Sequence, residues 1–407
     1  MTPRSIGVGT FRTTTRMRQY VNDVLHTGRI SYGPYSRAFE EQFAALHGCQ
    51  YAVLSNSGTS SLHVALQTLK ELHGWHDGDE VLVPAITFVA TVNVVLHCRL
   101  TPVLVDVERD YYGMDMNLIA EAITERTRAI IPVHPFGQPC NMKRIITNAV
   151  DFDLKVIEDS CEAMFVRHHD YPVGSMGDIG CFSTYVAHLI TTGVGGIATT
   201  NDPEYAVRMR SLVNHGRDGI YLAIDDDAGL HGARLQEVIS RRFNFEHIGH
   251  SYRITEMEAA LGLAQLEDWE TMIARRQWNA AYLTAGLLPL QDRLQLPATR
   301  PHTSHSFMMY PIILRDEPKA ALCAWLEERG IETREMLPLI AQPCYKGLWD
   351  VEAYPVAQWV DRGGFYVGVH QNLTQDDLDY MIDAIKGYFN QQTAPYYKEH
   401  MLGEIEG

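Results

Sequence analysis

The sequence predicts an α/β protein, with a mainly parallel seven-stranded sheet covered by helices on both faces and a smaller C-terminal α+β domain. Two observations predict this fold. From Tyr51 onward, short apolar runs of strand character alternate with amphipathic stretches of helical period, which is typical of a parallel sheet between two helical layers. Near residue 286 this alternation ends. We therefore expect a large domain with an N-terminal arm over residues 1–286 and a small domain over residues 287–407.

The elements are predicted in chain order. The arm carries helices over residues 17–25 and 36–46, separated by the turn signal Gly33-Pro34. The strands of the sheet are expected at residues 51–54, 80–83, 101–107, 129–135, 155–158, 179–183 and 196–199, and the helices between them at residues 59–70, 88–97, 117–122, 142–149 and 203–214. One long helix is expected over residues 256–285. The small domain should contain a strand over residues 306–314, a helix over residues 318–329 and a last helix capped at Thr374.

Composition restricts the class of function. The chain has 407 residues, 46% of them hydrophobic and 21% charged, as in an ordinary soluble protein. A formal charge of −16 argues against binding to nucleic acid or to an anionic membrane surface. Seven cysteines lie far apart without a Cys-x-x-Cys pair, which favours reduced thiols in the cytoplasm. No leader and no apolar run of roughly 18 residues is found.

Three positions just after predicted strands could bind a ligand. The run Ser57-Gly-Thr-Ser60 opens a helix, so its amides and the Thr59 hydroxyl could hold a phosphate, or could simply cap the helix. Asp159 could pair with a cation such as a protonated pyridine nitrogen, or cap a helix. Phe88 could stack on a flat ring or belong to the core.

These positions fall within a dense series of motifs. They include Ser57-Gly-Thr59, Gly78-Asp-Glu-Val-Leu-Val-Pro-Ala-Ile-Thr-Phe88, Phe136-Gly-Gln138, Glu158-Asp159, Gly195-Gly196, His215-Gly-Arg217, Tyr252-Arg253 and Ala259-Ala-Leu-Gly262. Together they resemble the sugar aminotransferase (DegT/DnrJ/StrS) family of fold-type-I pyridoxal phosphate enzymes, which act on nucleotide-linked keto-sugars. The resemblance covers most of the chain and implies the aminotransferase fold.

The resemblance also implies a role for each matched residue. Gly58, Thr59 and Ser183 would hold the phosphate of pyridoxal 5'-phosphate, Phe88 would stack on its ring, and Asp159 would pair with the ring nitrogen. Ser251 stands where an asparagine of the partner subunit usually contacts the phosphate. The resemblance further implies a homodimer with shared active sites, in which the region around Tyr252-Arg253 is donated across the interface.

His188 departs from the common family pattern. In ordinary members, a lysine binds the cofactor covalently. It stands seven positions before the residue that corresponds to Gly195, and in this chain that position is His188. Histidine cannot form that bond, but it can act as a general base. A histidine at this position resembles the pattern of the keto-deoxysugar 3-dehydratase branch of the colitose-pathway type, which uses pyridoxamine 5'-phosphate. Glu162 matches this branch too, because ordinary members usually carry glutamine there, and His215 is expected to face the sugar.

The resemblance thus implies a C3 dehydratase of a nucleotide-linked 4-keto-6-deoxyhexose, with glutamate as amino donor. Its catalytic residues would be His188, Asp159, Glu162 and His215, and its cofactor contacts would be Gly58, Thr59, Phe88, Asp159, Glu162, Ser183 and Ser251.

Two alternatives remain open. Leu189, Val194 and Ser251 differ from the pattern of the dehydratase branch, which leaves room for transamination, decarboxylation or elimination on an amino-acid-like substrate. Loss of the lysine also suits a non-catalytic protein, although an inert pocket has no need of residues that clamp a ring. No metal is predicted, because His247 and His250 lack a third ligand and too few cysteines follow His188 to hold an iron–sulfur cluster.

Overall fold

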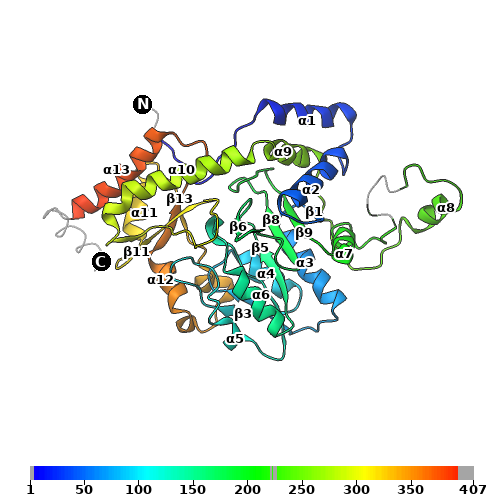
Figure 1. The fold of residues 1–407 in the computed structure, drawn as a ribbon, viewed down its shortest axis with the longest axis horizontal. Helices are drawn as coiled ribbons and strands as arrows, with labels where there is room; N and C mark the ends of the chain where they lie inside the picture. Colours follow the sequence, from blue (N-terminus) through cyan, green and yellow to red (C-terminus); the bar gives the residue numbers. More distant parts are fainter. Residues whose placement is uncertain (1–3, 221, 223–226, 393–407) are drawn as a thin grey trace.

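The computed structural model describes residues 4–220, 222 and 227–392 (Figure 1). Its largest element is a seven-stranded sheet. In spatial order the strands are β1 (Tyr51–Ser55), β9 (Gly196–Thr200), β8 (Ile179–Ser183), β5 (Lys155–Asp159), β4 (Thr127–Ile130), β2 (Glu80–Pro84) and β3 (Thr101–Val105). β9 is antiparallel to both of its neighbours, and the strands from β8 to β3 are parallel. The predicted mainly parallel sheet is therefore confirmed.

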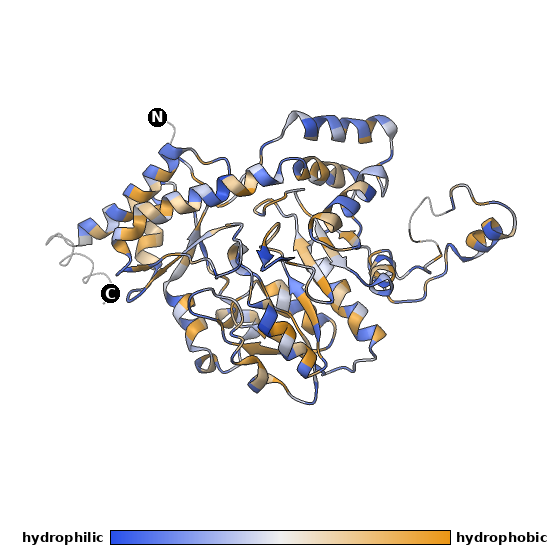
Figure 2. Ribbon diagram, in the orientation of Figure 1, coloured by the Kyte–Doolittle hydropathy of each residue, from blue (hydrophilic) through white to orange (hydrophobic). Residues whose placement is uncertain are grey.

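The two faces of this sheet enter different hydrophobic cores, because successive side chains of a strand point to opposite sides. In β2, Val81 and Val83 belong to the largest core and Leu82 to another. Residues of α3 (Gly58–Leu72), α4 (Val89–His97) and α7 (Pro203–Val213) fill the first core, and residues of α5 (Ile119–Ala122) and α6 (Met142–Asp151) fill the other. Figure 2 shows hydrophobic residues gathered in the strands and on the inner sides of these helices. The prediction of helices on both faces is confirmed.

The long helix predicted over residues 256–285 is wrong in one respect, because the segment forms two helices. α9 (Glu256–Leu266) ends before Glu267, and α10 (Trp269–Leu287) begins after Asp268, whose φ of −134° and ψ of 21° are not helical. Glu267 accepts hydrogen bonds from Arg16 Nε at 2.8 Å and from the Tyr20 hydroxyl at 2.5 Å, both in α1 (Thr15–Thr27). The break thus coincides with a contact to a helix far away in the sequence.

The C-terminal part builds a second, smaller sheet in the order β10-β11-β13-β12. Its strands are β10 (Leu294–Gln295), β11 (Tyr310–Leu314), β13 (Gly364–Val367) and β12 (Thr333–Glu335), and its helices are α11 (Ala320–Glu327), α12 (Pro355–Gly363) and α13 (Gln375–Gln392). Thr374 caps α13 as predicted, because its hydroxyl accepts the amide of Asp377 at 3.2 Å. The core of this part also takes Ile6 and, from α10, Ala280, Leu283 and Leu287. Residues 393–407 of the predicted small domain lie outside the described residues.

A buried carboxylate holds the start of α2 (Pro34–Leu46) against α9. Glu256 is 1% exposed, and its two oxygens accept the backbone amides of Gly33, Tyr35 and Ser36 together with the Ser36 hydroxyl, at 2.5–3.2 Å. The first amides of a helix have no acceptor within it, so this side chain supplies one.

Replacing Glu256 by alanine should lower the free energy of unfolding by on the order of 3 kcal/mol, because buried donors would lose their acceptor. Glu256→Gln should cost less, since it keeps one oxygen. Urea unfolding measures both effects, and the exposed Glu125→Gln serves as control. Equal stability of the Glu256→Ala variant and the wild type would contradict the prediction.

Candidate active site

The carboxyl ends of six strands of the large sheet lie at one edge, where β9 begins. β1 and β8 both run antiparallel to β9 and therefore share the direction of the remaining strands. Ser55 and Ser183, the last residues of β1 and β8, each pair with Gly196, the first residue of β9. Asp159 ends the adjacent strand β5. The sheet thus brings together predicted site residues that are far apart in the chain, at the edge where such sheets bind ligands.

Gly58 lies at the bottom of a narrow space between these strand ends. A Cβ atom at this position would lie 2.8 Å from Cys161 Sγ and 2.8 Å from Ser183 Cβ, so no other residue fits without movement. The helix α3 begins here with Ser57 as its cap, and Ser57 Oγ accepts the amide of Ser60 at 3.0 Å. Within the described residues, the amides of Gly58 and Thr59 find no acceptor.

This arrangement fits a phosphate group. Unused amides at a helix N-terminus attract anions, and the exposed Thr59 and the buried Ser183 add hydroxyl groups beside them. Three of the predicted phosphate contacts, Gly58, Thr59 and Ser183, therefore lie on one small patch of the sheet edge.

Asp159 is a buried carboxylate without a cationic partner in the described part of the chain. Its side chain is 4% exposed and accepts the Thr91 hydroxyl at 2.8 Å and the Cys161 amide at 3.2 Å. Burial raises the pKa of Asp159 despite these hydrogen bonds. A protonated ring nitrogen is the kind of group that would stabilise its ionised form.

Phe88 caps the neighbouring helix α4 and projects into solvent. Its side chain is 60% exposed, which is unusual for a phenylalanine beside a buried strand end. The adjacent Thr87 shares a hydrogen bond of 2.7 Å with Thr91, the residue that donates to Asp159. An exposed aromatic ring that is tied in this way to a buried carboxylate offers a flat ligand a stacking surface and a charge partner.

Glu162 lies three residues after Asp159 and accepts the amide of Phe136 at 2.7 Å. Burial raises the pKa of Glu162 to about 7, and the nearby carboxylate of Asp159 acts in the same direction. Near neutral pH this side chain can therefore either hold or release a proton.

This shifted pKa predicts a pH effect on stability. Between about pH 4.5 and pH 7 the folded protein retains the proton of Glu162 more strongly than the unfolded chain does. The contribution of Glu162 to stability is therefore complete below pH 4.5 and falls as the pH rises toward 7. In the Glu162→Gln variant, the melting temperature should fall less steeply between pH 4.5 and pH 7 than in the wild type. An unchanged dependence of the melting temperature on pH would contradict the prediction.

His188 lies on the loop between β8 and β9, five residues after Ser183. Its Nδ1 atom lies 3.2 Å from the Ser183 carbonyl oxygen, and its amide donates to Tyr185 O at 2.8 Å. Because a carbonyl only accepts, Nδ1 carries the hydrogen and Nε2 is left as the basic atom. Burial lowers the pKa of His188 to about 4, and the charge of Arg276 adds to this effect. The ring is thus neutral at physiological pH.

In the described part of the chain, His215 and Ser251 form their hydrogen bonds with residues other than Asp159, Glu162 and His188, although the amide of Asn56, just before Ser57, donates to the carbonyl of Tyr252 at 2.7 Å. His215 is exposed in a left-handed conformation with φ of 66°, and its amide donates to His250 O at 2.8 Å. Ser251 Oγ accepts Arg253 Nη2 at 2.9 Å. Within the described residues, neither side chain is hydrogen-bonded to Asp159, Glu162 or His188. Their predicted roles at the site therefore stay predictions.

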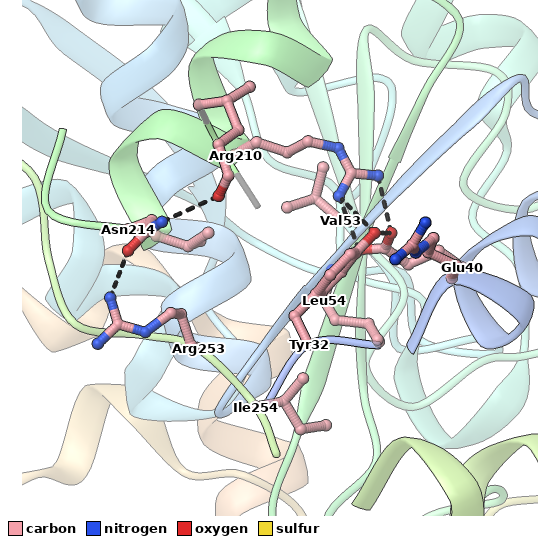
Figure 3. A pocket seen from close by; sticks show the side chains of 11 residues that line it. Tyr32, Glu40, Val53, Leu54, Arg210, Asn214, Arg253 and Ile254 are labelled. Carbon is pink, nitrogen blue, oxygen red and sulfur yellow. Dashed lines mark hydrogen bonds and ion pairs between the residues drawn. The ribbon is translucent and has the colours of Figure 1, made fainter. Parts of the chain in front are cut away.

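A separate cavity of about 250 Å³ lies beside β1 and is lined by none of the predicted site residues (Figure 3). Arg210 points across it and donates to Glu40 Oε2 at 2.8 Å, and Arg253 donates to Asn214 Oδ1. The positive charge of Arg210 is therefore neutralised by the carboxylate of Glu40. The chemistry of this cavity differs from that of the sheet edge, where Asp159 has no cationic partner among the described residues.

Three residues of the site were not singled out from the sequence. Thr91 and Cys161 hold the carboxylate of Asp159, and Cys161 also closes the space at Gly58. Both lie close behind matched motifs, three residues after Phe88 and two residues after Asp159, so this spacing was an available signal. Arg276, whose charge reaches His188, lies on α10 and had no local signal, because only the tertiary structure brings that helix near the loop.

The predicted absence of a metal site rested on His247 and His250. His250 Nε2 lies 2.9 Å from Gln67 Oε1, and His247 Nδ1 lies 3.8 Å from Glu71. Over residues 4–220, 222 and 227–392, no group of three or more His, Cys, Asp or Glu side chains is placed to bind a metal ion. Within the same residues, every helix is too short or too polar to cross a membrane.

Comparison with known proteins gives consistent matches over nearly the whole chain. The profile of the DegT/DnrJ/EryC1/StrS aminotransferase family matches residues 12–386. GDP-perosamine synthase from Caulobacter vibrioides is 34% identical over 389 residues, which are 93% of this chain and 97% of that protein. The dTDP-4-dehydro-2,6-dideoxy-D-glucose 3-dehydratase from Saccharopolyspora spinosa is 32% identical over 376 residues, which are 88% of this chain and 80% of that protein.

A solved structure shares the fold. The GDP-4-keto-6-deoxy-D-mannose-3-dehydratase of E. coli, which holds hydrated pyridoxal phosphate, superposes with a TM-score of 0.83 over 94% of this chain and all of that one, at 24% identity. The fold predicted from the sequence, that of the fold-type-I aminotransferases, is therefore confirmed.

Proposed function

Given that the chain belongs to the DegT/DnrJ/EryC1/StrS aminotransferase family, we propose that it is a pyridoxamine phosphate-dependent C3 dehydratase of a nucleotide-linked 4-keto-6-deoxyhexose. Glutamate would supply the amine of the cofactor. The observation that carries the proposal is His188, which stands where ordinary members have a lysine. Within the described residues, Lys155 offers no substitute, because it lies at the opposite end of β5 and donates to Asp178 Oδ1 at 3.0 Å.

The residues of the sheet edge suit this cofactor. The amides of Gly58 and Thr59, with the hydroxyl of Ser183, would hold the phosphate, the ring of Phe88 would cover the pyridine, and the buried Asp159 would pair with its nitrogen. Pyridoxamine phosphate, when bound, supplies an amine that joins the keto group of the sugar and a ring that withdraws electrons from it.

His188 then acts as the base. Its Nδ1–H is oriented by the Ser183 carbonyl, which leaves Nε2 free to accept a proton from the C4′ atom of the cofactor. The same proton becomes available to the C3 hydroxyl as it departs as water. Glu162, with a pKa of about 7, is suited to assist the return of protons.

A direct assay tests the reaction. Purified protein would be mixed with pyridoxal phosphate, glutamate and a GDP- or CDP-linked 4-keto-6-deoxyhexose, and the products followed by mass spectrometry. We expect 2-oxoglutarate, ammonia and a sugar that has lost its C3 oxygen. A sugar that keeps this oxygen and gains an amine would refute the dehydratase and identify an aminotransferase.

The aminotransferase is the second candidate, and one observation favours it: the 34% identity with GDP-perosamine synthase over 93% of the chain. If the assay is repeated with other amino acids in place of glutamate, a change in the cofactor absorption band together with release of carbon dioxide would indicate decarboxylation. Failure to bind either cofactor form would indicate a non-catalytic protein. The exposed Phe88 and the buried Asp159, which has no cationic partner among the described residues, argue against that outcome, because an exposed ring and an unpaired buried carboxylate do not stabilise the fold.

We also propose a homodimer with shared sites in the cytoplasm, where seven free cysteines remain reduced. The segment that carries α8 (Gly232–Arg241) extends away from the rest of the molecule (Figure 1). It exposes four large hydrophobic side chains, which are Ile239, Phe243, Phe245 and Ile248. Exposed apolar surface of this kind favours contact with another protein surface, here that of a second subunit.

Changing Phe243 and Ile248, which are 76% and 88% exposed, to aspartate should dissociate the dimer. Light scattering should report a mass near twice 46.0 kDa for the wild type and near 46.0 kDa for the variant. Val150→Asp, which changes a residue of α6 with a similar exposure of 74%, is the control. A wild-type monomer that retains activity would contradict the shared site.

A further inference from the structure

Arg276 is a buried cation that has no anionic partner in the part of the chain that the structure describes. The side chain lies on α10, is 1% exposed, and forms no ion pair with any residue in the described ranges. Its Nε donates to Gln371 Oε1 at 3.0 Å, and its Nη1 donates to the carbonyls of Phe307 and Met308 at 3.2 and 3.0 Å. For Nη2 the described residues supply no acceptor. Charged groups are rarely buried unless they are paired, so this one requires an explanation.

Other buried polar atoms beside Arg276 are also unused. Asn279, one turn along α10, donates to the carbonyls of Val369 and His370 at 3.3 and 2.9 Å. The Oδ1 atom of Asn279 and the Nδ1 atom of His370 are buried and find no partner among the described residues. Segment 369–372 therefore lies against α10, with several polar groups available to a bound molecule.

The N-terminal segment connects this region to the His188 loop. Thr10 Oγ1 accepts a hydrogen bond from Asn372 Nδ2 at 3.3 Å. The adjacent Gly9 packs so closely on the loop that a Cβ atom there would lie 2.9 Å from Ala187 Cα, next to His188. Arg12 follows, exposed and without an ion pair among the described residues.

The two arginines share a neighbourhood. Burial is the main cause that lowers the pKa of His370, to about 4, and both Arg276 and Arg12 add to it. Arg276 has the same effect on His188. In a chain with a formal charge of −16, two unpaired cations around His370 and His188 create a local field that attracts anions.

We propose that Arg276 and Arg12 form an oxyanion subsite next to His188. Resting on the proposed function, the ligand group is either a carboxylate of the amino donor or the diphosphate of the nucleotide sugar. Arg276 would offer its two free Nη2 hydrogens from a fixed position, since three hydrogen bonds hold the rest of its guanidinium. Arg12 would contribute from the exposed side.

Equilibrium binding tests the subsite without turnover. Isothermal titration with glutamate and, separately, with GDP, CDP and dTDP would be performed on the protein loaded with pyridoxamine phosphate. Arg276→Lys and Arg12→Gln should each weaken binding of one ligand class roughly 10- to 100-fold, which corresponds to a hydrogen bond with a charged group. The controls are Arg275→Gln, the neighbour that donates to Leu373 O at 2.9 Å, and the exposed Arg18→Gln.

The outcomes are distinct. Loss confined to glutamate assigns the subsite to the carboxylate, and loss confined to the nucleotides assigns it to the diphosphate. Unchanged affinities in both variants would overturn the proposal. So would a loss limited to Arg276→Lys and accompanied by a lower melting temperature, because Arg276 would then serve the fold alone. Failure of the dehydratase assay leaves these binding results unaffected, so the two proposals fail separately.

Discussion

Replacing His188 by glutamine should reduce turnover about 10²- to 10⁴-fold, the range that a general base contributes. Glutamine can still donate to the Ser183 carbonyl, which lies 3.2 Å from His188 Nδ1, but it has no basic atom in place of Nε2. Cofactor affinity should change little, since the proposed contacts to the phosphate, the ring and its nitrogen all lie on other residues. Steady-state kinetics and a cofactor titration by fluorescence measure the two quantities.

The exposed His302→Gln is the matched control for this change. The pH dependence adds a second criterion. Because burial holds the pKa of His188 near 4, the ring stays neutral as the pH falls through 6.5, and the acid limb of kcat/KM should lie well below that of an ordinary histidine. Full activity of the His188→Gln variant would contradict the assigned role.

Changing Asp159 to asparagine should weaken cofactor binding about 10²- to 10³-fold. Loss of one partner of a buried ion pair costs roughly 3–5 kcal/mol, and about 1.4 kcal/mol corresponds to a factor of ten. Asparagine can still accept the Thr91 hydroxyl that now bonds to Asp159 at 2.8 Å, so the fold should remain intact. The dissociation constant of pyridoxal phosphate, measured by fluorescence quenching, reports the effect.

Asp170→Asn, on an exposed turn, controls for the loss of one negative charge. A variant at Asp159 that binds pyridoxal phosphate as tightly as the wild type would mean that the ring nitrogen has another partner. Unchanged thermal stability of the apoprotein would show that the loss belongs to the cofactor contact.

Much of the large sheet was predictable because its strands are buried on both faces. Such strands read as short apolar runs, and β2, with Val81 and Val83 on one side and Leu82 on the other, is an example. The candidate site residues were predictable for a related reason, since ligand-binding residues follow these runs directly. Gly58, Asp159 and Ser183 are placed together by strand order alone.

Other features depend on contacts between distant segments. The apolar pattern continues across residues 256–285, so the break at Glu267 and Asp268 carried no local signal; it coincides with hydrogen bonds from Arg16 and Tyr20. His215 and Ser251 matched a family pattern, but within the described residues their side chains form no hydrogen bond with His188, Asp159 or Glu162, so their roles stay predictions.

The sequence by itself determined the succession of strands and helices along the large domain and the glycine at the start of α3, because burial period and residue chemistry are local properties. The significance of His188 came from the resemblance to the family, whose ordinary members carry a lysine there. Only the tertiary structure decided that Glu256 caps α2, that Arg276 is buried without a counter-ion among the described residues, and that His188 is held neutral. Hydrogen bonding and desolvation of these groups arise from segments that meet only after folding, and no local pattern encodes them.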